Sequence, residues 1–110
     1  MDILYATEAL QRLCLTERIA KKKLGASCAK KLRARIEDLA SARWVSELIA
    51  GRPHPLTGVQ AGKFSVRLQG GCRLVFEPAN EPIPTKENDG SIAWGQVDRV
   101  RIVYIGDYHD

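Results

Sequence analysis

The sequence predicts a small α+β domain, with helices in the amino-terminal part followed by strands. Apolar residues recur at helical spacing between residues 10 and 39, and they alternate with polar residues along segments 64–68 and 72–76. The 110 residues are 45% hydrophobic, which suffices for one modest core. We therefore expect a single domain over residues 1–110.

The first elements are a short strand at residues 3–5 and two helices. Thr7 is a suitable N-cap and Glu8 suits a first turn, so a helix should start there. Gly25 should end this helix directly after its lysine-rich last turn. Ser27 should cap a second helix, whose apolar residues at 28, 32, 36 and 39 share one face.

A hairpin is predicted between residues 64 and 76, and its register matters most. A three-residue loop at 69–71 pairs Arg67 with Arg73 and Phe64 with Phe76, whereas a two-residue turn would put Arg73 among core residues. Like charges directly opposite one another destabilise a sheet, so the paired arginines suggest a phosphate between them. The alternative is that each arginine pairs with a carboxylate or lies in water.

The segments around the hairpin complete the prediction. A helical turn is expected within residues 44–49, followed by an extended stretch in which His54 lies between Pro53 and Pro55. Residues 77–97 should form a long surface loop. Trp94 should pack this loop onto the body, with stacking on a base or a partner protein as the alternative. The apolar run 100–105 should be a central strand buried on both faces.

Charge and cysteine usage bear on the partner and the compartment. Residues 1–73 hold 14 lysines and arginines against six acidic residues, while residues 74–110 hold three against seven. The basic part indicates a polyanion such as nucleic acid, with solvation as the alternative. The three cysteines form no metal-ligand cluster and suit buried positions in a reducing cytosol. No segment is apolar enough for a membrane span, so we expect a cytoplasmic protein without membrane contact.

Three motifs in this order resemble the HigB branch of the RelE/ParE toxins from bacterial toxin–antitoxin systems, and the likeness covers nearly the whole chain. They are His54-Pro-Leu-Thr-Gly with Gly62-Lys-Phe-Ser-Val-Arg, then Arg73-Leu-Val-Phe, and finally Asp107-Tyr108-His109. The resemblance implies two amino-terminal helices packed on one face of a small antiparallel sheet, which leaves the opposite face open for the arginines. Thr57 departs from the pattern, because a lysine is common there in the family.

The resemblance also implies an activity. Members of this branch are metal-independent, cofactor-free ribonucleases that cut mRNA on the ribosome; a helix-turn-helix antitoxin silences them, and operator DNA is met only through that antitoxin. The residues that match the family's active face are His54, Arg67, Arg73, Asp107, Tyr108 and His109. The basic residues expected to contact RNA are Lys30, Lys31, Arg33, Arg35 and Lys63.

The chemistry that fits is attack of a ribose 2′-hydroxyl on the adjacent phosphate, which needs charge stabilisation, a proton acceptor and a proton donor. The two arginines supply the first. His54 or His109 can transfer a proton, while Asp107 can orient a histidine or take the proton itself, so acid and base stay unassigned. Two alternatives remain: a non-enzymatic, ParE-like inhibitor of DNA gyrase, and a catalytically inactive RNA-binding module.

Overall fold

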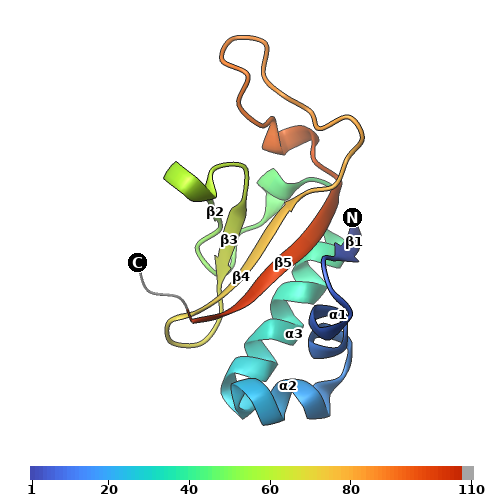
Figure 1. Cartoon of the computed structure of the whole chain (residues 1–110), viewed down its shortest axis with the longest axis vertical. Helices are drawn as coiled ribbons and strands as arrows, with labels where there is room; N and C mark the ends of the chain where they lie inside the picture. The colour runs from blue at the N-terminus through green and yellow to red at the C-terminus, as the bar shows by residue number, and fades with distance from the viewer. Residues whose placement is uncertain (108–110) are drawn as a thin grey trace.

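The protein folds into a five-stranded sheet with helices against one face (Figure 1). This computed structural model describes residues 1–107. Across the sheet the strands are β1 (Asp2–Tyr5), β5 (Arg99–Asp107), β4 (Cys72–Pro78), β3 (Phe64–Arg67) and β2 (His54–Pro55). The α+β class is confirmed, but the sheet is mixed, because β1 runs parallel to β5 while the other pairs are antiparallel.

Three helices, rather than the expected two, precede the hairpin: α1 (Glu8–Leu15), α2 (Glu17–Leu24) and α3 (Ala26–Ser41). Thr7 caps α1 as predicted, since its side chain accepts a hydrogen bond from the Leu10 amide. The chain breaks at Thr16, an extended β-branched residue whose amide closes α1 on the Arg12 carbonyl. A periodicity argument could not detect this break, because both short helices present their apolar residues to the same core.

Gly25 ends α2 as expected, but the cap proposed for the next helix was wrong. Gly25 has a φ of 84° and serves both as the C-cap of α2 and as the N-cap of α3. A positive φ is readily available to glycine, so the chain turns from one helix directly into the next. Ser27 therefore lies inside the first turn of α3, and its side chain makes no cap hydrogen bond.

The hairpin register is confirmed. Arg67 lies opposite Arg73, and Phe64 lies opposite Phe76, with their rings stacked at 5.4 Å between centroids. The Leu68 amide donates to the Cys72 carbonyl at 2.9 Å, which closes the loop at residues 69–71. Phe64, Val66, Leu74 and Phe76 then face the helices and join one core with them.

The expectation that β5 is buried on both faces was wrong. It is an internal strand, and Val100 and Ile102 are fully buried, but Tyr104 is 39% exposed. The register with β4 shifts between Val75 and Phe76, so β5 carries an extra residue at this bulge. Helices cover only one face of the sheet, and the other face leaves alternate side chains of β5 accessible to solvent.

Three short 3₁₀ helices and a long loop complete the chain: η1 (Val45–Glu47), η2 (Gly58–Gln60) and η3 (Trp94–Gln96). η1 confirms the turn expected at 44–49. The loop begins later than expected, because β4 runs to Pro78, and it contains a bridge between Thr85 and Ile92. Trp94 packs against Phe64 at 4.8 Å, which is the structural use predicted for it. No helix within residues 1–107 is long and apolar enough to cross a bilayer.

Candidate active face

The face of the sheet opposite the helices is here called the open face, and two of its register rows hold the candidate residues. The register aligns His54, Ser65, Val75 and Tyr104 across four strands, and of these His54 and Tyr104 are exposed while Ser65 and Val75 are buried. The next row holds Arg67, Arg73 and Gly106. Adjacent strands are about 4.8 Å apart, so each row spans roughly 10–15 Å, a width that suits a nucleotide segment.

Arg67 and Arg73 form the cationic centre of the open face. Arg67 is exposed, whereas Arg73 is half-buried. One terminal nitrogen of Arg73, Nη1, is buried and has no hydrogen-bond partner among residues 1–107. Neither arginine forms an ion pair with a carboxylate among residues 1–107. Of the alternative stated above, a carboxylate partner is thus not found in the described part of the chain, whereas the exposed Arg67 fits a guanidinium in water.

His54 lies at the edge of the open face on the two-residue strand β2. The side chain is exposed, and its Nδ1 lies 2.8 Å from the backbone carbonyl oxygen of Arg52. Arg52 is exposed and has a φ of 47°, in the left-handed region that residues with a side chain rarely adopt. The two flanking prolines keep His54 extended, so the imidazole projects from a fixed backbone.

Tyr104 is a member of the open face that the sequence did not reveal. A Cβ atom placed on Gly106 would lie 2.8 Å from the Tyr104 hydroxyl oxygen, so the phenol folds along β5 over this glycine. Since Gly106 is the register partner of Arg73, the hydroxyl group is directed toward the arginine row. The sequence feature that could have indicated an exposed position was a single tyrosine in an otherwise aliphatic strand, two residues before a glycine.

The carboxy-terminal candidates are placed differently. Asp107 lies opposite Cys72, which faces the core, so alternation puts the carboxylate on the helix side of the hairpin end. A Cβ on Gly71 would meet its Oδ1 at 2.7 Å, which locates the carboxylate beside the hairpin loop. The structure thus separates Asp107 from the Arg67–Arg73 row. Tyr108 and His109 lie outside the described residues.

Comparisons with known proteins identify the fold. Neither a family model nor a curated protein matches the chain. A solved YoeB/ParE toxin from Agrobacterium tumefaciens is similar, with a TM-score of 0.59 and 15% identity over 99% of this chain and 100% of that one. The chain has the RelE/ParE-like fold.

Two Staphylococcus aureus structures support this assignment. A YoeB-YefM complex superposes with a TM-score of 0.57, and a YoeB dimer with 0.56. Each is 14% identical and matches all of this chain and 98% of its own. The coverage is therefore nearly complete in both directions for all three structures.

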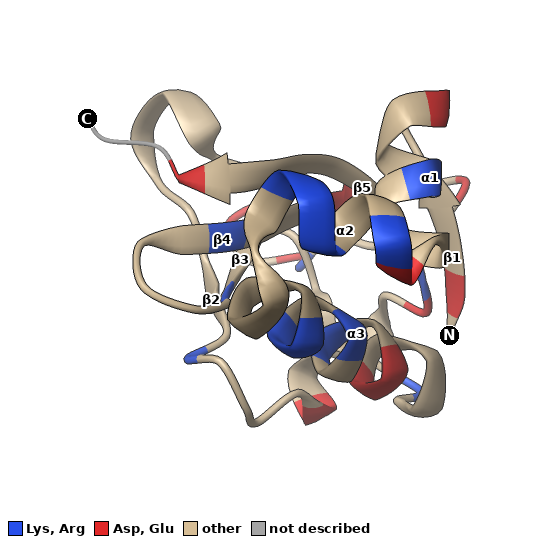
Figure 2. Cartoon of the chain, turned by 90° about the horizontal axis from the view of Figure 1, so that it is seen from below, with Lys and Arg blue, Asp and Glu red and all other residues tan. Residues whose placement is uncertain are grey.

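On this RelE/ParE-like fold the basic residues of α2 and α3 lie side by side on the helix side (Figure 2). Lys30 and Lys31 are exposed, in agreement with a role in RNA contact. Arg33 instead lies within 3.7 Å of Glu17 and 3.5 Å of Glu37. Arg35 is only 15% exposed and pairs with Asp38 at 3.0 Å, so its charge is largely engaged.

Lys63 is the remaining basic candidate and belongs to the other side of the sheet. It is half-buried, and its ammonium group donates to the Gln60 side chain at 3.0 Å. It therefore sits between η2 and β3, near His54 in sequence but apart from the lysines of α3. The structure consequently divides the predicted RNA contacts between two surfaces.

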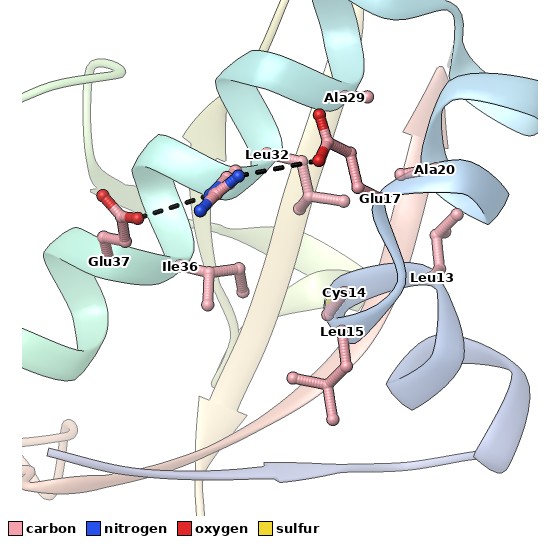
Figure 3. Close-up of a pocket in the computed structure, with 10 residues that line it drawn as sticks. Leu13, Cys14, Leu15, Glu17, Ala20, Ala29, Leu32, Ile36 and Glu37 are labelled. Atoms are coloured by element: carbon pink, nitrogen blue, oxygen red, sulfur yellow. Dashed lines mark ion pairs between the residues drawn. The ribbon is translucent and has the colours of Figure 1, made fainter.

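A groove of about 380 Å³ lies between α1, α2 and α3 on the helix side (Figure 3). Apolar side chains such as Leu13 and Ile36 line it, and Leu15 at its edge is 63% exposed. Arg33 also lines the groove, and its ion-pair partners Glu17 and Glu37 line it too. The groove contains no histidine, so it lacks the proton-transfer group found on the open face.

Cys28 and Cys72 are buried, as expected, whereas Cys14 is only half-buried. Burial raises the pKa of the Cys72 thiol to about 12, with a further contribution from the adjacent Cys28. Burial likewise raises the pKa of Cys14 to about 12. Within residues 1–107, no cluster of three histidine, cysteine or acidic side chains could hold a metal ion.

Proposed function

We propose that this chain is the toxin of a bacterial type II toxin–antitoxin system and a ribosome-dependent endoribonuclease that cuts mRNA without a metal ion. The RelE/ParE-like fold supports the toxin role, since similar structures are named as YoeB or YoeB/ParE toxins. Assignment to the HigB branch is part of the proposal and rests on the sequence motifs around His54, Arg73 and Asp107.

The observation that carries the proposal is the pair of arginines set side by side on an open face, one row from a histidine. Two arginines at opposite register positions repel, and neither has an ion-pair partner among residues 1–107. A phosphodiester between them removes this repulsion and gives the planar guanidinium groups their preferred partner. His54 then lies in reach of the neighbouring ribose.

The proposed reaction proceeds by in-line attack. The 2′-oxygen forms a bond to phosphorus, the bond from phosphorus to the 5′-oxygen breaks, and a cyclic phosphate and a 5′-hydroxyl result. Arg67 and Arg73 stabilise the charge on the phosphoryl oxygens. The 2′-hydroxyl loses one proton and the leaving 5′-oxygen gains one, and His54 carries out one of these two transfers. Tyr104 adds a hydroxyl group beside Arg73. Asp107, Tyr108 and His109 enter the proposal through the resemblance alone.

The ribosome positions the mRNA in this proposal, so a site with modest acid–base power suffices, because orientation alone contributes several kcal/mol. Lys30 and Lys31 contact ribosomal RNA from the helix side. An antitoxin partner is supported by the similar structure of YoeB in complex with YefM. A helix-turn-helix fold for that antitoxin, and a cytoplasmic location, follow from the resemblance.

The test is to induce the chain in a bacterium and to map mRNA 5′ ends. The proposal expects growth arrest with new ends inside translated frames. An Arg73→Lys variant should lose the ends, since lysine cannot form a bidentate contact. Growth arrest with inhibited gyrase and intact mRNA would replace the proposal by the ParE-like alternative. Ribosome binding without either effect would leave only an RNA-binding module.

A further inference from the structure

We propose that the turn formed by Gly51 and Arg52 is a positioning device for His54. The Arg52 carbonyl holds the imidazole in the tautomer that is protonated at Nδ1, so that Nε2 is the nitrogen that exchanges a proton with the substrate. Arg35 of α3 supports this turn from the helix side and acts as a positioning residue, not as an RNA contact. Only the step to the substrate rests on the proposed ribonuclease function.

The hydrogen bond between His54 and Arg52 fixes the tautomer. The Nδ1 atom of His54 lies 2.8 Å from the carbonyl oxygen of Arg52. A carbonyl oxygen only accepts, so Nδ1 must carry the hydrogen. In a neutral imidazole the lone pair is then on Nε2, and in the protonated ring Nε2 carries the transferable proton. Since His54 is exposed, Nε2 is accessible from the open face.

The carbonyl that makes this bond belongs to a strained residue. Arg52 has a φ of 47°, which a residue with a side chain adopts only where its surroundings impose it. Gly51 before it has a φ of 85°. The Gly51 carbonyl accepts the Arg67 amide at 2.6 Å, which ties the turn to β3 and to one of the two arginines of the open face. The turn thus links His54 to Arg67.

Arg35 closes the turn from the other side. A Cβ atom on Gly51 would lie 2.9 Å from the Arg67 carbonyl oxygen and 3.2 Å from Cδ of Arg35. Gly51 is therefore clamped between the backbone of β3 and the aliphatic stem of Arg35. The guanidinium of Arg35 is 3.0 Å from Asp38, and the side chain is 15% exposed. The charge of Arg35 is thus paired with Asp38 within α3, whereas its stem is the part that contacts the Gly51 turn.

The test is ¹⁵N NMR of the histidine side chains at a pH where His54 is neutral. Wild type should show a protonated Nδ1 and an unprotonated Nε2, the reverse of the tautomer that free imidazole side chains prefer. Gly51→Ala should lose this tautomer, because the added methyl group displaces the turn. Cleavage of ribosome-bound mRNA should then fall by about 10²-fold. Gly90→Ala is the matched control, since Gly90 has a φ of 72° but no atom within 4 Å of an added Cβ.

A pair of Arg35 variants tests the supporting residue, also if Gly51→Ala does not fold. Arg35→Met keeps the stem and removes the charge, so it should retain the His54 tautomer and cleavage within about twofold. Arg35→Ala removes the stem and should lose both. If the two variants lose cleavage equally and leave the tautomer unchanged, Arg35 is an RNA contact and its positioning role is refuted.

Two results separate this inference from the proposed function. An Nε2-protonated His54 in a wild-type protein that cuts mRNA overturns the positioning role, while the ribonuclease function stands. An Nδ1-protonated His54 in a folded protein that cuts no mRNA supports the role of the turn in orienting the ring, but it overturns the proposed function and the catalytic step together.

Discussion

Replacing Arg73 by methionine should stabilise the chain and abolish mRNA cleavage. Arg73 is half-buried and lies opposite Arg67, and its Nη1 atom has no hydrogen-bond partner within the described residues 1–107. Such a residue lowers the free energy of unfolding, so we expect it to be retained because it binds an anion. Methionine keeps most of the aliphatic stem and removes the charge and the orphaned donor.

The expected magnitude follows from these features. A buried polar atom without a partner costs about 1–3 kcal/mol. A like charge directly across a sheet adds roughly 0.2–1 kcal/mol. Imperfect packing of methionine lowers this stabilisation by up to ~1.5 kcal/mol. We expect the free energy of unfolding to rise by about 1 kcal/mol, which corresponds to a Tm increase of roughly 4 °C.

Urea unfolding of purified protein measures the stability, and end mapping of ribosome-bound mRNA measures the cleavage. Arg101→Met is the matched control, because Arg101 is a half-buried arginine that pairs with Glu77 at 3.1 Å. The control should be less stable than wild type and should keep cleavage. If Arg73→Met lowers the free energy of unfolding by more than the control does, the view of Arg73 as a residue kept for an anion is refuted.

Three further predictions concern other parts of the molecule. Gly106→Ala should reduce cleavage about as much as Tyr104→Phe, as measured by mRNA end mapping, because its methyl group displaces the phenol. Exchanging Lys30 and Lys31 for glutamine should weaken cosedimentation with ribosomes and flatten its dependence on salt. The free energy of unfolding should fall as the pH rises from about 9 toward 12, because the folded state raises the pKa of the Cys72 thiol. Urea unfolding in a pH series measures this fall, and Cys72→Ala should make the free energy of unfolding depend less steeply on pH.

Each of these predictions has a result that contradicts it. Normal cleavage by Gly106→Ala would mean that the Tyr104 hydroxyl has no part in the reaction. An unchanged salt dependence in the lysine variant would leave α3 merely solvated. The sign of the pH effect follows from a raised pKa: the thiol stays protonated when folded and ionises when unfolded, so a stability that rises above pH 9 would contradict the burial of Cys72.

The hairpin was predictable because its constraint is local. Phe64, Val66, Leu74 and Phe76 must share one face, and only one loop length achieves this and aligns Arg67 with Arg73. The helix break at Thr16 was not predictable, because α1 and α2 present compatible apolar faces on either side of it.

The site was predicted in part, and the misses depend on contacts distant in sequence. Arg35 reads as a surface residue in its helix, but the Gly51 turn, 16 residues later, covers it. Tyr104 reads as part of a buried strand, but the bulge in β5 and the uncovered face of the sheet expose it. Arg52 gave no signal, because its importance lies in its φ and its carbonyl group and not in its side chain.

The position of β5 also governs how the chain reaches its fold. This strand follows every other described element along the chain, yet it lies between β1 and β4 in the sheet. Asp2 therefore pairs with Arg99, which is almost the full length of the chain away. Contacts between such distant residues slow folding, because the intervening chain must first be ordered. Until residues 99–107 have been synthesised, β1 and β4 expose unpaired edges that favour aggregation. The arginine row also lacks Gly106 and the phenol above it, so a growing chain holds an incomplete active face until its final strand is in place.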